Sequence, residues 1–107
     1  MIASGALESL CRALIERGWW VTAAERTDAT VIIGFNFIPG GHPSWLKAFE
    51  VPHADANIPG VEAAIEAWKA RVRASLERGY ASETVRLMVA EHGPERVREA
   101  MRGRLLV

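Results

Sequence analysis

A short polar connection between two β-forming segments constrains the fold of this chain most. The segments cover residues 19–24 and 29–38, and both contain β-branched and aromatic residues. The connection, residues 25–28, is too short for the crossover that joins parallel strands, so we predict an antiparallel hairpin. The second strand is apolar on both faces, which predicts a central position, and Gly34 permits a bulge or the close approach of another backbone.

Four further segments carry the pattern of amphipathic helices. Residues 4–17 repeat apolar side chains at helical spacing and stop at Gly18. A longer helix begins at Asn57 or Pro59 and ends at Gly79. Two shorter helices, over residues 82–92 and 94–102, complete the chain.

The segment from residue 39 to residue 60 is rich in proline and glycine and has two readings. Residues 44–51 alternate as a strand would, and a short helix capped by Ser44 fits nearly as well. We favour the strand, because a loop of about 20 residues without structure is uncommon inside a small domain.

These elements predict one α+β domain over residues 1–107. It comprises an N-terminal helix, a small antiparallel sheet of two to three strands, and a C-terminal cluster of three helices packed on the sheet. The composition, 50% apolar and 24% charged, is that of an ordinary globular chain. The single cysteine, Cys11, lies on the apolar stripe of the first helix, which predicts a buried core residue. No stretch approaches the roughly 18 apolar residues of a membrane span, and the N-terminus lacks the pattern of a signal peptide, so we expect a cytoplasmic protein without a membrane partner.

Residues with catalytic or metal-binding chemistry are scattered. His42, His53 and Asp55 share the proline-rich segment, but no closely spaced pair gives local chelation. Ser44 has no Gly-x-Ser-x-Gly elbow around it, and no phosphate-binding loop is present. We therefore expect a non-enzymatic protein without a cofactor, and keep a metal-dependent enzyme at these three residues as an alternative.

Tryptophan and arginine carry the interface chemistry of this chain. Neighbouring strand residues point to opposite faces, so only one of Trp19 and Trp20 enters a given core. The other is covered by a helix or the C-terminal tail of the same chain, or it faces a partner or a second copy. Both residue types are enriched at interface hot spots. The predicted partner-binding residues are Trp19, Trp20, Trp45, Arg96, Arg98, Arg102 and Arg104.

Nucleic-acid binding is a second alternative, through the last two helices read as a helix-turn-helix. The match is poor, because Glu99 falls where such a helix buries an apolar side chain. Pairing of Arg96 with Glu99, or of Glu95 with Arg98, on a solvated helix face explains these charges, and we favour it over DNA contact. Residues 1–68 hold 4 basic and 8 acidic side chains and residues 69–107 hold 9 and 5, so the zero net charge still permits a basic C-terminal surface.

The sequence thus predicts a protein-interaction module that self-associates or binds a partner protein as a regulator or inhibitor. Small proteins of this kind include those of phages and mobile elements that inhibit host defence, an expectation that rests on size and on the lack of motifs. A transcriptional regulator and a metal-dependent enzyme remain the alternatives.

Overall fold

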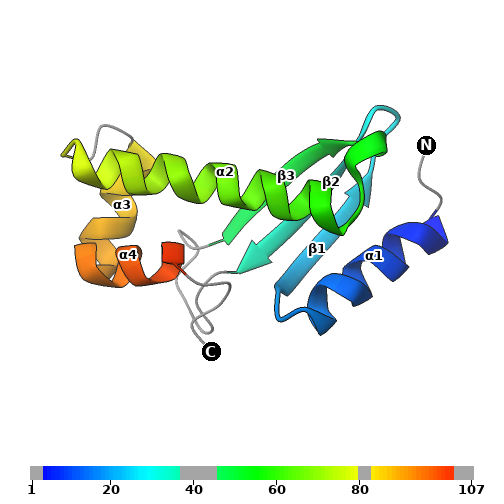
Figure 1. Cartoon of the computed structure of the whole chain (residues 1–107), viewed down its shortest axis with the longest axis horizontal. Helices are drawn as coiled ribbons and strands as arrows, with labels where there is room; N and C mark the ends of the chain where they lie inside the picture. The colour runs from blue at the N-terminus through cyan, green and yellow to red at the C-terminus, as the bar shows by residue number, and fades with distance from the viewer. Residues whose placement is uncertain (1–3, 37–45, 80–82, 103–107) are drawn as a thin grey trace.

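The computed structural model describes residues 4–36, 46–79 and 83–102, which form the predicted α+β fold (Figure 1). In chain order the elements are α1 (Ser4–Glu16), β1 (Trp20–Arg26), β2 (Thr30–Asn36), β3 (Leu46–Pro52), the short 3-10 helix η2 (His53–Asp55), α2 (Ile58–Glu77), α3 (Glu83–His92) and α4 (Pro94–Arg102).

The three strands form one antiparallel sheet with β2 in the centre. The predicted hairpin, the central position of the second strand and the strand reading of the third segment are all confirmed. The register between β1 and β2 shifts between Val21 and Ala23, which is a β-bulge opposite Gly34. A Cβ atom at Gly34 would lie 2.9 Å from Thr22 Oγ1, so glycine leaves the space that the bulged residue occupies.

One face of the sheet holds the core at this end of the molecule. Helices α1 and α2 cover that face in Figure 1, where α1 lies beside β1 and α2 runs over β3. A chain of edge-to-face aromatic contacts crosses it. Trp19 packs on Phe35 with ring centroids 5.8 Å apart, Phe35 on Phe49 at 5.9 Å, and Phe49 on Trp68 of α2 at 5.7 Å. The sheet is thereby joined to α2.

Helix α2 runs through one continuous core and joins its sheet end to its helical end. The Asn57 side chain accepts a hydrogen bond of 2.8 Å from the Gly60 N–H, and Pro59 lies in the first turn, as the sequence predicts. The first half of α2 packs on the sheet, and its second half packs on α3 and α4. The molecule is therefore elongated, 41 × 25 × 20 Å.

The second end is a helical core. Its buried side chains come from α2, α3 and α4, which pack on one another, and the three-helix cluster meets the sheet through α2. Gly93 has φ +83°, which lets α3 stop and α4 start within one residue. The buried apolar residues here are Val72, Leu76, Val85, Met88, Val97, Ala100 and Met101.

Candidate interaction surface

The two adjacent tryptophans separate as predicted, one inside and one outside. Trp19 is 3% exposed, whereas Trp20, the first residue of β1, is 40% exposed. Trp19 is therefore part of the protein's own core, and Trp20 is the member of the pair that a partner can reach.

Polar contacts hold Trp19 and fix the start of β1. The Trp19 indole N–H donates to Glu62 Oε2 at 2.8 Å, and Arg17 donates to both oxygens of the same carboxylate at 3.0 and 2.8 Å. The hydrogen bonds and the charge of Glu62 raise the pKa of Arg17. Lys69, itself 1% exposed, has its Nζ 5.2 Å from the centroid of the Trp19 ring. This cluster ties the turn between α1 and β1 to α2, and so sets the direction in which Trp20 leaves the core.

The face of the sheet opposite α1 and α2 carries mainly small, apolar and acidic side chains. The strand register places them in rows across β1, β2 and β3. Trp20 pairs with Asn36, and the next two rows are Ala23, Gly34 and Ala48, then Glu25, Ile32 and Glu50. We call these last six residues together with Trp20 the open sheet face.

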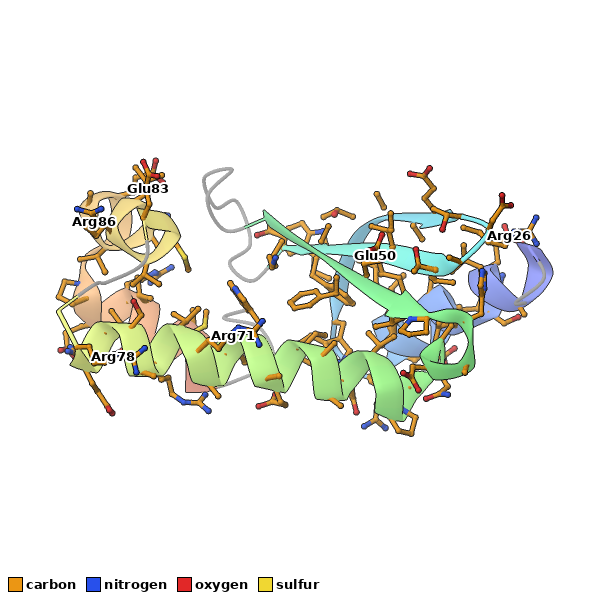
Figure 2. All side chains as sticks on the ribbon, turned by 90° about the horizontal axis from the view of Figure 1, so that it is seen from above. Arg26, Glu50, Arg71, Arg78, Glu83 and Arg86 are labelled. Carbon is orange, nitrogen blue, oxygen red and sulfur yellow. The ribbon has the colours of Figure 1, made fainter. Side chains whose placement is uncertain are left out.

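Exposure distinguishes this face from the helix-covered one. On the covered face Val31, Ile33 and Phe35 of β2 are buried, whereas Ile32 and Gly34 between them are only half-buried. On the open side of β2 the exception is Asn36, which pairs with Trp20 and is buried. Ala23, Glu25, Ala48 and Glu50 are exposed. In Figure 2 the helix α2 runs along one side of the sheet and Glu50 lies on the other. No described helix packs on the open sheet face.

The charge of the molecule is uneven in space. All charged residues up to position 68 lie in the described part of the chain, 8 acidic and 4 basic, so this part of the chain has a net charge of −4. The described part of residues 69–102 exposes five arginines, at positions 71, 73, 78, 86 and 96, against five glutamates, and Arg98 is half-buried. Lys69 is buried over the Trp19 ring at the sheet end, the side chain of Arg102 is outside the described side chains, and Arg104 is outside the described residues. The described helical end therefore has nearly balanced exposed charge.

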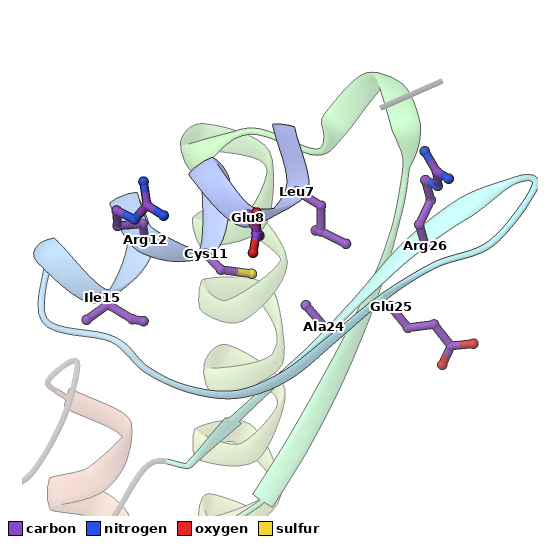
Figure 3. A pocket seen from close by; sticks show the side chains of 8 residues that line it. All are labelled: Leu7, Glu8, Cys11, Arg12, Ile15, Ala24, Glu25 and Arg26. Carbon is purple, nitrogen blue, oxygen red and sulfur yellow. The ribbon is translucent and has the colours of Figure 1, made fainter. Parts of the chain in front are cut away.

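A groove of about 560 Å³ separates α1 from β1 (Figure 3). Cys11 points into it and is half-buried, which corrects the prediction of a core cysteine: the stripe of α1 faces the exposed edge strand here instead of a closed core. Partial burial raises the pKa of its thiol. Ile15, 56% exposed, lies at the rim together with the charged side chains of Glu8, Arg12 and Arg26. Glu25 borders the groove, but its side chain points away from α1, towards the other side of the sheet (Figure 3).

The predicted arginines Arg96 and Arg98 lie on α4, which packs mainly on α2 and α3. Arg98 donates to Glu95 Oε1 at 2.6 Å, which confirms the expected pair on the helix surface. Arg96 is exposed. The structure thus does not bring the described arginines Arg96 and Arg98 together with Trp20 in one surface, and Trp45 lies outside the described residues.

The residues weighed as metal ligands are partly engaged in the fold. His53 Nε2 lies 2.8 Å from the Thr27 carbonyl oxygen, which can only accept, so this nitrogen donates and links η2 to the β1–β2 hairpin. Asp55 is exposed, and His42 is outside the described residues. Within residues 4–36, 46–79 and 83–102, no group of three or more His, Cys, Asp or Glu side chains is arranged to hold a metal ion.

Sequence reasoning singled out Trp20 and missed the row formed by Glu25, Ile32 and Glu50. Both glutamates belong to alternating segments, but the pairing that puts them on either side of Ile32 depends on the register of all three strands. The burial of Lys69 had a signal, since it lies four residues after Ile65 on the apolar side of α2.

None of the helices in the described part of the chain is both long enough and apolar enough to cross a membrane. Comparison of the chain with protein-family models, with curated proteins and with solved structures gave no match.

Proposed function

We propose that this protein is a non-enzymatic interaction module that binds a partner protein through the open sheet face. The observation that carries the proposal is the one-sided covering of the sheet: α1 and α2 pack on one face, and the other presents Trp20, 40% exposed, beside small residues. Exposed aromatic residues presented from a well-ordered surface are typical anchors of protein interfaces.

The order around Trp20 also supports this proposal. Its neighbour Trp19 is fixed by Glu62 and by the Phe35 ring, so Trp20 is presented from a rigid strand. A rigid anchor loses little conformational entropy when it binds. Action as a regulator or inhibitor follows if the partner's own active or binding surface is what becomes covered.

The test is affinity capture with a matched pair of variants. The tagged wild-type protein, Trp20→Ala and Leu87→Ala are used to capture proteins from the cells that express the chain. Leu87 is the control because it is an apolar side chain of similar exposure, 55%, at the helical end. We expect a partner that is retained by the wild type and by Leu87→Ala and is depleted about tenfold by Trp20→Ala.

Two results contradict the proposal. One is a partner recovered equally well with Trp20→Ala, and the other is the absence of any stoichiometric partner together with a strictly monomeric protein in analytical ultracentrifugation. A homodimer that Trp20→Ala dissociates would identify the partner as a second copy of the chain.

A further inference from the structure

We infer that the open sheet face binds a basic amphipathic helix of a partner protein. This inference rests on the proposed function and specifies the chemistry of the partner. It starts from the charge of the face: the described side chains that point from it include two exposed carboxylates, Glu25 and Glu50, and no lysine or arginine.

The two carboxylates flank an apolar centre. Glu25 pairs with Ile32 in the β1–β2 register, and Ile32 pairs with Glu50 in the β2–β3 register. Strands in a sheet are about 4.8 Å apart, so the two glutamate Cα atoms are separated by about 10 Å with Ile32 between them. A single Lys or Arg side chain laid over Ile32 can reach either carboxylate.

The adjacent row lets a helix approach the sheet closely. It consists of Ala23, Gly34 and Ala48, and the bulged Thr22 places its hydroxyl over the glycine. Large side chains that would hold a helix away are thus absent from this row. Beyond it, Trp20 offers an aromatic ring to the apolar stripe of a partner helix.

The spacing between these features sets a pattern for the partner. The rows of Trp20 and of Glu25 are connected through Asn36 and Ile32, four residues apart on β2, which is about 13 Å. On one face of an α-helix, a residue seven or eight positions along lies about 11–12 Å away, and the long side chain of Lys or Arg spans the rest. The partner helix therefore carries an apolar anchor and a basic residue about two turns apart.

Charge also separates this partner from a second copy. Two open sheet faces in contact would bring the Glu25 and Glu50 carboxylates of both copies together, and residues 1–68 of each copy already have a net charge of −4. Like charges brought together at an interface oppose association. Strand addition along the edge of β1 is disfavoured by the bulge at Val21 and Ala23, since bulges on edge strands discourage edge-to-edge pairing.

The probe is a synthetic amphipathic helix of about 15 residues with a leucine stripe edged by lysines, and the same peptide with glutamate in place of lysine. Binding is measured by fluorescence anisotropy of the labelled peptides. We expect the lysine peptide to bind, and its Kd to rise at least about tenfold for Glu25→Lys/Glu50→Lys and for Trp20→Ala. Glu83→Lys/Glu91→Lys, which makes the same charge change at the helical end, changes the Kd by less than about twofold.

The possible outcomes separate this inference from the proposed function. Equal effects of the two charge-reversed variants, or equal binding of the two peptides, overturn the basic-helix inference. If Trp20→Ala loses the natural partner but Glu25→Lys/Glu50→Lys retains it, the open sheet face is supported as the interaction surface and the basic helix is contradicted as its partner. If neither variant changes the capture of that partner, both proposals fail. If the protein dimerises and Trp20→Ala abolishes the dimer, the partner of the open sheet face is a second copy of the chain and the basic-helix inference is wrong.

Discussion

The sheet end and the helical end of the molecule are built on the same helix, α2, but only one of them leaves a face of its framework uncovered. At the helical end α2, α3 and α4 surround their apolar side chains on all their inner faces. At the sheet end α1 and α2 pack on one side of a three-stranded sheet, and no described helix packs on the other. Three helices can bury their stripes against one another, whereas a single sheet needs a second layer on each apolar face.

The two ends also use different side chains to fill their cores. The sheet end relies on a directional chain of aromatic rings from Trp19 to Trp68. The helical end uses aliphatic residues with Met88 and Met101, whose unbranched side chains adapt to irregular gaps. The sheet end is therefore the more geometrically specified of the two, which suits it to present a binding surface.

Replacement of Trp19 by alanine should have the largest effect on folding. Trp19 is 3% exposed and contacts Phe35, Glu62 and Lys69, so we expect Trp19→Ala to lower the free energy of unfolding by about 3–5 kcal/mol. Urea denaturation followed by circular dichroism measures this. Met88→Leu at the helical end, which conserves volume, should cost less than about 1.5 kcal/mol. If Trp19→Ala and Met88→Leu lowered the free energy of unfolding equally, the packing of the two ends would not differ in the way described above.

Two glycines, one at each end of the molecule, test whether lack of space or backbone conformation makes an alanine destabilising at that position. A Cβ at Gly60 would overlap the Asp55 carbonyl group, so Gly60→Ala should cost about 2–3 kcal/mol. Gly93 has open space around it but φ +83°, so Gly93→Ala should cost only about 1 kcal/mol. Gly93→Asn should recover part of that loss, because asparagine tolerates this backbone region, and thermal denaturation of the three variants provides the comparison. A larger loss for Gly93→Ala than for Gly60→Ala would contradict the assignment.

The ion pairs of the two ends should also differ in how much they contribute to the free energy of unfolding. Glu62 accepts from the buried Trp19 indole, so Glu62→Ala leaves that donor without its partner and should cost about 1–2 kcal/mol. Glu95 pairs with Arg98 on the exposed surface of α4, and Glu95→Ala should cost less than about 0.5 kcal/mol. Chemical denaturation at low and high salt measures both. If the two losses were the same, the Glu62 cluster would be an ordinary surface pair.

Much of this fold follows from local signals in the sequence. Helical periodicity, with glycines at the helix ends, predicts all four α-helices. In the structure Gly18, Gly79 and Gly93 have positive φ, as residues that end helices commonly do. The length of the 25–28 connection predicts the hairpin. The alternation in residues 44–51 predicts β3, because a strand there shortens an improbable loop.

The open sheet face could be predicted from the sequence only in part, because it depends on contacts between residues that are far apart in the chain. Strand alternation sends Trp19 and Trp20 to opposite sides, but the burial of Trp19 depends on Glu62 and Lys69, more than 40 residues away in the chain. The row of Glu25, Ile32 and Glu50 requires the register of three strands and the position of a bulge. Cys11 was expected in the core because periodicity gives the apolar side of α1 without showing what that side faces.

The smallest effect concerns Cys11, which belongs to the second opening at the sheet end, the groove between α1 and β1. Partial burial raises the pKa of its thiol above the ordinary value of 9.0, so folding favours the neutral thiol. The resulting stabilisation is present below pH 9 and is lost as the pH rises through the higher pKa of the folded state. We expect the unfolding free energy of the wild type to decline slightly more than that of Cys11→Ala in this alkaline range.

Iodoacetamide should alkylate Cys11 more slowly in the folded protein than in urea at the same pH, because the thiolate is the reactive species. Alkylation at equal rates in the two states would mean that the groove is open to solvent down to the sulfur atom, and that α1 packs less closely on β1 than α2 packs on β3.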